Sequence, residues 1–196
     1  MAARSTWIGP EEGAVEAAIG LGGNLGDSRA LLTGALAALA EAPGLRLRAV
    51  SPWYRTAPVG PPQPDYLNGC ALVTTTLPAE ALLELLLATE ARFGRVRRER
   101  WGPRRLDLDL LFHGSHVIET PHLRVPHPLL AERGFVLVPL ADVAPRWRHP
   151  LLGQSVVELL EAWRHRPPDG RVGSSTIEES PPHAQPLLRR FASPGD

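Results

Sequence analysis

Apolar residues recur along the chain with two different spacings. Residues 45–50 alternate Leu-Arg-Leu-Arg-Ala-Val, and residues 66–77 are rich in β-branched side chains. Because successive side chains of a strand point to opposite faces, these patterns predict strands with one or both faces buried. The predicted strands are residues 16–21, 45–50, 66–77, 106–112 and 135–140.

Three other segments carry apolar residues at helical spacing. The first follows Asp27, which is suited to cap a helix, and is stopped by Pro43-Gly44. The second, residues 79–93, begins after Pro78 and ends at Gly94, and the third spans residues 154–164. Hairpin-compatible and helical connections are mixed in this order of elements, which predicts an α+β sandwich.

The ends of the chain differ in composition from its centre. Residues 1–14 form a polar, Gly- and Pro-containing lead-in that we expect to be flexible. Residues 167–196 are dominated by Pro, Ser, Gly and charge, which predicts a disordered tail. The 196 residues therefore predict one domain over residues 15–166.

Composition excludes several kinds of chemistry. The formal net charge is zero, and all 21 Lys and Arg positions are arginine, so neither a phosphate-binding loop that ends in lysine nor a Schiff-base lysine is available. The single cysteine, Cys70, cannot form an internal disulfide and is expected to be a small buried residue. No apolar run has transmembrane length and no signal-peptide pattern precedes the domain, so the cytoplasm is the expected location.

Two aspartates at strand spacing form the first candidate site. Asp107 and Asp109 flank Leu108, so their side chains share one strand face, ~7 Å apart at the backbone, while the leucines face a core. Two carboxylates on an apolar strand repel each other, and a hard cation such as Mg²⁺ relieves that repulsion. The alternative is the polar side of an amphipathic edge strand, and the motif by itself does not decide between them.

A basic loop leads directly into that strand. Residues 95–105 contain six arginines together with Trp101 and a Gly102-Pro103 turn. Arginines this close repel one another unless an anion lies among them, and the triphosphate of ATP is one such anion. The alternative is a solvated basic loop.

Residues suited to a flat ring follow a proline-rich loop. Residues 56–65 contain four prolines, which forbids regular structure there. Asn68 can donate and accept hydrogen bonds at the edge of a heterocycle, and Tyr66 and Phe135 can lie on its faces. Each of these residues alone is also compatible with core packing.

Together these motifs resemble one family. The run Arg100-Trp101-Gly102-Pro103-Arg104-Arg105-Leu106-Asp107-Leu108-Asp109-Leu110-Leu111 is similar to the signature of the 6-hydroxymethyl-7,8-dihydropterin pyrophosphokinases. Residues 19–27, 54–60, 64–68, 125–128 and 133–137 resemble further family segments, in the same order.

The resemblance implies a ferredoxin-like α/β sandwich with a mainly antiparallel sheet and flanking helices. It also implies diphosphate transfer from ATP to the pterin hydroxymethyl group in folate biosynthesis, with two Mg²⁺ ions on Asp107 and Asp109. The implied pterin residues are Thr56, Val59, Tyr66, Asn68, Trp101 and Phe135. The implied nucleotide residues are Glu90, Arg97, Trp101, Arg104, Leu110, His127 and Arg133. Arg95 and Arg104 are expected to act in catalysis from a loop that closes over the site.

The chain departs from the family pattern at three nucleotide positions. Leu87 stands where some members have a polar contact, and His122 and Arg124 stand where some carry Arg and Thr. These differences concern individual nucleotide contacts and leave the metal pair and the pterin residues unchanged.

Two other functions fit part of the pattern. A nucleic-acid-binding module would use the arginine loop and Trp101, and would predict steeply salt-dependent binding. Another Mg²⁺-dependent nucleotidyl or phosphoryl transferase would leave Tyr66 and Asn68 without a role. We expect a monomer with small-molecule substrates and neither a nucleic acid nor a membrane as partner.

Overall fold

A single antiparallel sheet carries the long strands of the protein. The computed structural model describes residues 13–58, 62–95, 102–167 and 177–179. The strand order is β5-β1-β4-β3-β8, where β3 is Tyr54–Thr56 and β8 is Glu178–Glu179, and β2 also pairs with β4. The central strands are β1 (Val15–Gly23) and β4 (Tyr66–Thr75), and β5 (Asp107–His113) pairs with β1. Four of the five predicted strands are therefore confirmed, as β1, β2 (Leu45–Val50), β4 and β5.

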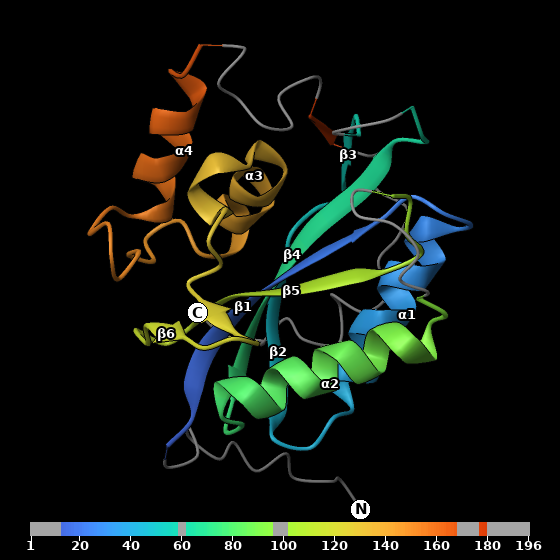
Figure 1. Ribbon diagram of the computed structural model, residues 1–196, viewed down its shortest axis with the longest axis horizontal. Coiled ribbons are helices and arrows are strands. Elements are labelled where there is room, and N and C mark those ends of the chain that lie inside the picture. Colours follow the sequence, from blue (N-terminus) through green and yellow to red (C-terminus); the bar gives the residue numbers. More distant parts are fainter. Residues whose placement is uncertain (1–12, 59–61, 96–101, 168–176, 180–196) are drawn as a thin grey trace, which may run out of the picture.

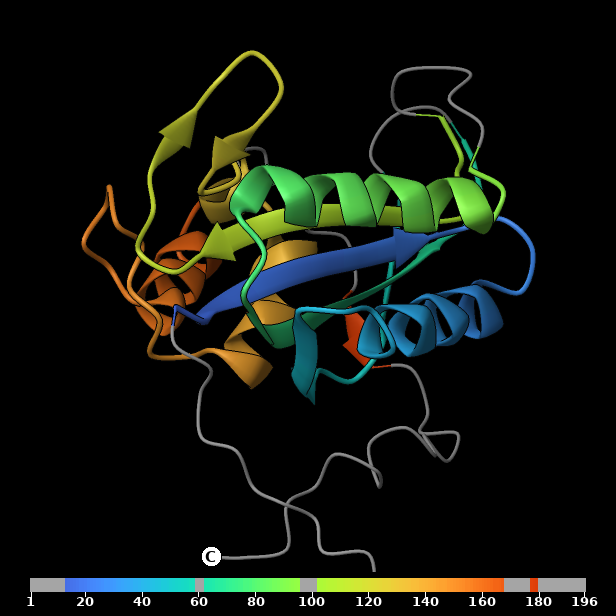
Figure 2. The same cartoon turned by 90° about the horizontal axis from the view of Figure 1, so that it is seen from below.

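Two helices cover one face of this sheet. Helix α1 (Ser28–Ala40) begins where the Asp27 carboxylate accepts a hydrogen bond from the Ala30 N–H, as predicted. Helix α2 (Ala79–Arg92) begins after Pro78. Their buried leucines pack with Ala17, Ile19 and Leu21 of β1 in one core. Figure 2 shows α1 and α2 running side by side across this face.

The opposite face is covered by α3 (Gly134–Val143) and α4 (Val156–Arg164) (Figure 1). Their apolar residues form a second core with Ala18 of β1, Cys70 of β4 and Phe112 of β5. Cys70 is fully buried, as the sequence predicted. Alternation along β1 thus divides its side chains between two cores, because neighbouring residues point to opposite faces.

Helix α3 corrects the prediction of a strand at residues 135–140. A short apolar run has no periodicity that distinguishes a buried strand from a buried helix. In the structure Val136, Leu137 and Leu140 are all buried, which is the spacing of one helical face, and Pro139 lies within the helix. The sheet below the helix determines this outcome, since all three side chains pack into its second core.

The structure adds short elements that the sequence did not predict. Strand β3 (Tyr54–Thr56) pairs with β4, so the irregular loop begins only after Thr56. Strands β6 (Ile118–Glu119) and β7 (Arg124–Val125) form a separate hairpin, followed by a 3₁₀ turn at Leu130–Glu132. Strand β8 (Glu178–Glu179) lies in the predicted disordered tail and departs from that expectation because it pairs with β3.

The other tail residues, 168–176 and 180–196, and residues 1–12 of the predicted flexible extension lie outside the described residues. None of the described helices is long and apolar enough to span a lipid bilayer.

Substitution of Gly134 tests the contact between α3 and α4. A Cβ atom at Gly134 would overlap the indole of Trp163. We expect Gly134→Ala to lower the free energy of unfolding by about 1–3 kcal/mol, the usual effect of overpacking, although alanine favours helices. Denaturant unfolding of Gly134→Ala in the native and Trp163→Leu backgrounds measures this. Equal costs in the two backgrounds would contradict the proposed overlap.

Candidate active site

The two aspartates lie on the outermost long strand of the sheet. Asp107 and Asp109 are partly buried on one face of β5, while Leu108 and Leu110 are buried in the core under α1 and α2. The shared face predicted from the spacing is therefore present. It is the face that α3 covers, with Phe135 and Val136 lining a small cavity beside both carboxylates.

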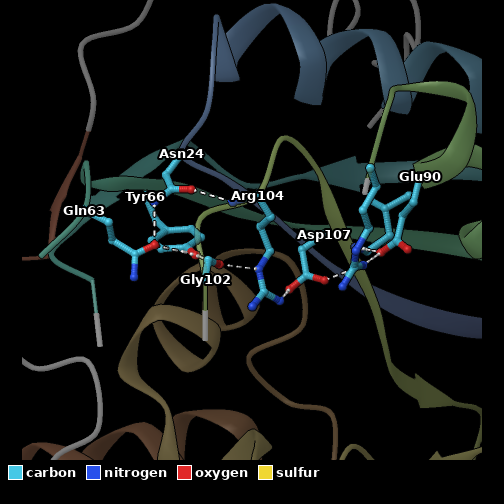
Figure 3. Close-up of polar contacts among 9 residues, drawn as sticks. Asn24, Gln63, Tyr66, Glu90, Gly102, Arg104 and Asp107 are labelled. Atoms are coloured by element: carbon cyan, nitrogen blue, oxygen red, sulfur yellow. Dashed lines mark hydrogen bonds and ion pairs between the residues drawn. The ribbon is translucent and has the colours of Figure 1, made fainter. Parts of the chain in front are cut away.

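Arginines occupy both oxygens of Asp107. Arg95 Nη1 lies 2.6 Å from Asp107 Oδ1. Arg104 Nη1 lies 2.8 Å from Oδ2 of the same carboxylate (Figure 3). Arg95 also pairs with Glu90 of α2. The basic loop and the pair of carboxylates, which the sequence indicated separately, are thus joined in one network of charge-assisted hydrogen bonds.

Glu90 joins α2 to β5. Its side chain is only 2% exposed and accepts a hydrogen bond from the Leu108 N–H at 2.7 Å. This hydrogen bond lies on the outer edge of β5, which is the edge that does not pair with β1. The end of α2 fixes both the strand that carries the aspartates and the arginine that contacts Asp107.

Asp109 has an environment suited to a cation. Burial, and then the charge of Asp107, raises the pKa of Asp109 to about 7, whereas Arg133 opposes the shift. Among the described residues no third His, Cys, Asp or Glu joins the pair. A pair of carboxylates of this kind fits Mg²⁺, which usually takes its remaining ligands from waters and substrate phosphates.

A first cavity, of about 110 Å³, opens on one side of the aspartates. Asn68, which is 5% exposed, donates a 2.7 Å hydrogen bond from Nδ2 to Thr56 Oγ1. A Cβ atom at Gly22 would lie 2.7 Å from Asn68 Oδ1, so glycine is needed there. The cavity combines polar groups at its edge with aromatic rings, which suits a flat heterocycle. Its lining comprises Gly22, Thr56, Ala57, Tyr66, Asn68, Arg104, Asp107, Asp109, Arg133 and Phe135.

A second and larger cavity, of about 350 Å³, opens on the other side of the same aspartates. It runs between α2, β5 and the β6–β7 hairpin. Leu87, His122 and Arg124, the three positions that depart from the family pattern, all line it. Its other lining residues include Glu90, Arg95, Leu110, His127 and Pro128.

His127 is held as a neutral donor in this second cavity. Burial, and then the charge of Arg133, lowers the pKa of His127 to about 4. Its Nδ1 accepts a hydrogen bond from the Leu129 N–H at 3.2 Å. A neutral imidazole that accepts at Nδ1 carries its proton on Nε2, which can therefore donate to an anionic oxygen.

Asn24 connects the two loops that flank the site, a role that the sequence did not reveal. Its Nδ2 donates to Gln63 Oε1 (3.0 Å) and to the Pro64 carbonyl (2.9 Å), and its Oδ1 accepts from the Arg104 N–H at 2.9 Å (Figure 3). The Tyr66 hydroxyl lies within hydrogen-bonding distance of Gln63 and of the Gly102 carbonyl. Residues 19–27 resembled a family segment, but that resemblance did not indicate which residues Asn24 would contact.

The residues predicted from the sequence divide between the two cavities. Thr56, Tyr66, Asn68 and Phe135 line the first, and Glu90, Leu110 and His127 line the second. Arg104 and Arg133, which were expected at the nucleotide, line the first cavity. Val59, Arg97 and Trp101 lie outside the described residues.

Sequence comparisons relate the chain to one family of proteins. The family described as 7,8-dihydro-6-hydroxymethylpterin-pyrophosphokinase (HPPK) matches residues 18–145, which is more than half of the chain. The 2-amino-4-hydroxy-6-hydroxymethyldihydropteridine pyrophosphokinase of Synechocystis is 49% identical over 74% of this chain and 74% of its own length. The protein of the same name from Pseudomonas aeruginosa is 47% identical over 74% of this chain and 89% of its own length.

Solved structures show the same fold at low sequence identity. The wild-type Plasmodium falciparum HPPK-DHPS with pteroate matches with a TM-score of 0.63 at 14% identity, over 76% of this chain and 42% of that chain. A triple mutant of that protein matches with a TM-score of 0.62 at 13% identity, over 76% of this chain and 43% of that chain. The present chain spans less than half of these longer chains. The fold is ferredoxin-like, as predicted.

Proposed function

The chain belongs to the 7,8-dihydro-6-hydroxymethylpterin-pyrophosphokinase family, and from this premise we propose how its residues transfer pyrophosphate from ATP to hydroxymethyldihydropterin in folate biosynthesis. One observation carries the proposal: Asp107 and Asp109 line both cavities. A phosphoryl donor in one cavity and an acceptor in the other would meet at these carboxylates.

The first cavity is the proposed pterin site. Asn68 and Thr56 offer hydrogen-bonding groups to the edge of the ring, and Tyr66 and Phe135 offer aromatic surface for its faces. Asn68 is fixed by its bond to Thr56 and by its close approach to Gly22. The ring would therefore bind to a preformed site, which positions its hydroxymethyl group near the aspartates.

The second cavity is the proposed ATP site. Its walls combine the apolar side chains of Leu87 and Leu110 with His127, whose neutral imidazole can donate a hydrogen bond from Nε2 to a phosphate oxygen. Arg95 and Arg104 are bound to Asp107 in the structure. We propose that both arginines exchange this carboxylate for phosphate oxygens when ATP binds, which keeps each charge paired before and after binding.

Asp107 and Asp109 would hold two Mg²⁺ ions, with the remaining ligands from phosphates and water. The raised pKa of Asp109 supports this role, because burial and then the charge of Asp107 disfavour its ionised form, and a bound cation would offset both effects. When bound, the metal neutralises phosphate charge and polarises the phosphoryl group. The arginines add positive charge where negative charge develops as the hydroxymethyl oxygen attacks the β-phosphorus and AMP leaves.

The nucleic-acid alternative is less compatible with the described part of the arginine loop. Arg95 and Arg104 pair with Glu90 and Asp107 and point into the site, so they do not present a free basic face. The cytoplasmic location, the monomeric state and the number of metal ions stay predictions. We propose residues 15–166 as the catalytic domain.

A direct assay tests the proposed reaction. We expect AMP formation from ATP only when 6-hydroxymethyl-7,8-dihydropterin and Mg²⁺ are both present, and loss of activity when EDTA removes the metal. Release of AMP is followed by chromatography, with excess Mg²⁺ after EDTA as the control for reversibility. Binding of both substrates by calorimetry without AMP release would refute the catalytic proposal and leave a protein that only binds.

A further inference from the structure

The C-terminal segment adds a strand beside the proposed pterin cavity. Glu178 and Glu179 form β8, which pairs antiparallel with β3 in the register Arg55↔Glu178 and Tyr54↔Glu179. Figure 1 shows β8, in red, lying alongside β3. This segment lies beyond residue 145, where the match to the family ends, so it is a feature of this chain rather than of the matched region.

Strand β3 places one wall of that cavity. It is only three residues long and ends at Thr56, whose Oγ1 accepts the hydrogen bond from Asn68. Its inner edge pairs with β4, with Tyr54 opposite Asn68 and Thr56 opposite Tyr66. Any shift of β3 relative to β4 therefore changes the spacing of Thr56, Tyr66 and Asn68 at the pterin edge.

Two further contacts attach this corner to α3. Ile177, just before β8, packs against the core formed with α3 and α4. The Tyr54 hydroxyl donates to Asp142 Oδ2 at 2.8 Å. Burial chiefly raises the pKa of Asp142, and the charge of Glu179 adds to the effect, which indicates that β8 lies close to this carboxylate. Strand β3 is thus held from three sides, by β4, β8 and α3, and α3 also carries Phe135.

We propose that residues 177–179 are a positioning element for the pterin site. A three-residue edge strand without β8 would expose its outer N–H and C=O groups and would be free to splay from β4. Pairing with β8 limits this motion by adding a strand to the sheet edge, and so preorganises Thr56 against Asn68. The inference rests on the proposed pterin site for the identity of the ligand.

Paired substitutions in the full chain test this role. Glu178→Pro with Glu179→Pro removes the N–H groups of β8, whereas Glu178→Thr with Glu179→Thr removes the same charges and keeps a strand-forming backbone. Chains ending at residue 176 or at residue 179 form a second pair, which differs only in Ile177, Glu178 and Glu179. Calorimetry measures the affinity for 6-hydroxymethyl-7,8-dihydropterin, with a non-hydrolysable ATP analogue and Mg²⁺, and separately the affinity for the analogue.

We expect the proline variant and the 176-residue chain to bind the pterin about three- to tenfold more weakly, the effect of one or two ordinary hydrogen bonds. The threonine variant and the 179-residue chain should match the full chain, and affinity for the ATP analogue should stay within about twofold throughout. Unchanged pterin affinity in the proline variant, or an equal loss of affinity for both ligands, would overturn the inference alone. A full chain that binds no pterin would overturn the proposed function and the inference together.

Discussion

Asp109→Asn is expected to lower the rate of pyrophosphate transfer at least about a thousandfold while the protein stays folded, since loss of a metal ligand removes several kcal/mol of transition-state stabilisation. The substitution keeps the shape of the side chain and removes only its charge. Among the described residues only Asp107 and Asp109 line both cavities, so the substitution leaves a single carboxylate between donor and acceptor. The measurement is kcat for AMP release at saturating Mg²⁺.

The same variant should be more stable than the native protein when no metal is present. The pKa of Asp109 is raised to about 7 in the folded protein, above its ordinary value of 3.8. A raised carboxyl pKa means that folding stability falls as pH rises from about 4 to about 7, because the folded state must give up a proton that the unfolded state has already lost. At pH 8 the native protein carries this full penalty and Asp109→Asn does not. We therefore expect a higher Tm for the variant at pH 8 in EDTA, and a much smaller difference at pH 4.

Glu84→Gln provides the matched control for both measurements. Glu84 is an exposed carboxylate on α2, the helix that also carries Glu90. Its neutralisation should leave kcat unchanged and should not reproduce the higher Tm at pH 8 in EDTA. An Asp109→Asn protein with near-native kcat would refute the metal assignment, and one with a lower Tm at pH 8 would refute the proposed cost of keeping a buried Asp109 ionised beside Asp107.

Asn24→Ala is expected to lower kcat/KM by about ten- to a hundredfold for both substrates. The side chain is 5% exposed and makes three hydrogen bonds, to Gln63, Pro64 and Arg104. Alanine leaves the Pro64 carbonyl and the Arg104 N–H without these partners, at a cost of about 1–3 kcal/mol for each group that stays buried. Pro64 lies just before Tyr66, and Arg104 pairs with Asp107, which lines both cavities. We therefore expect the residues of both cavities to lose their alignment together.

Two companion variants separate this coupling from general destabilisation. Gln63→Ala removes a single bond of Asn24, so it should raise KM for the pterin more than KM for ATP. Gln154→Ala, at an exposed position near α4, should leave both values unchanged. If Asn24→Ala changed Tm but left both kcat/KM values intact, the residue would be structural only and its proposed positioning role would be wrong.

The sequence by itself determined the elements whose signals are local. These signals, which each depend on a few neighbouring residues, are the alternation along residues 45–50, the helix cap at Asp27, the helix start after Pro78 and the helix end before Gly94. The structure has β2, α1 and α2 at these places. The shared face of Asp107 and Asp109 follows from strand geometry alone. The motifs around them identified the family for the same reason, since their order along the chain is a property of the sequence.

The tertiary structure decided whatever depends on residues far apart in the chain. The run at residues 135–140 became a helix because the sheet required three of its apolar side chains on one face. Asn24 acquired its role through partners 39, 40 and 80 positions away, and Arg104 and Arg133 were assigned to the first cavity by the way β4, β5 and α3 meet. Pairing of Glu178 and Glu179 with β3 likewise depends on an available sheet edge, which no local pattern in a polar, proline-rich segment encodes.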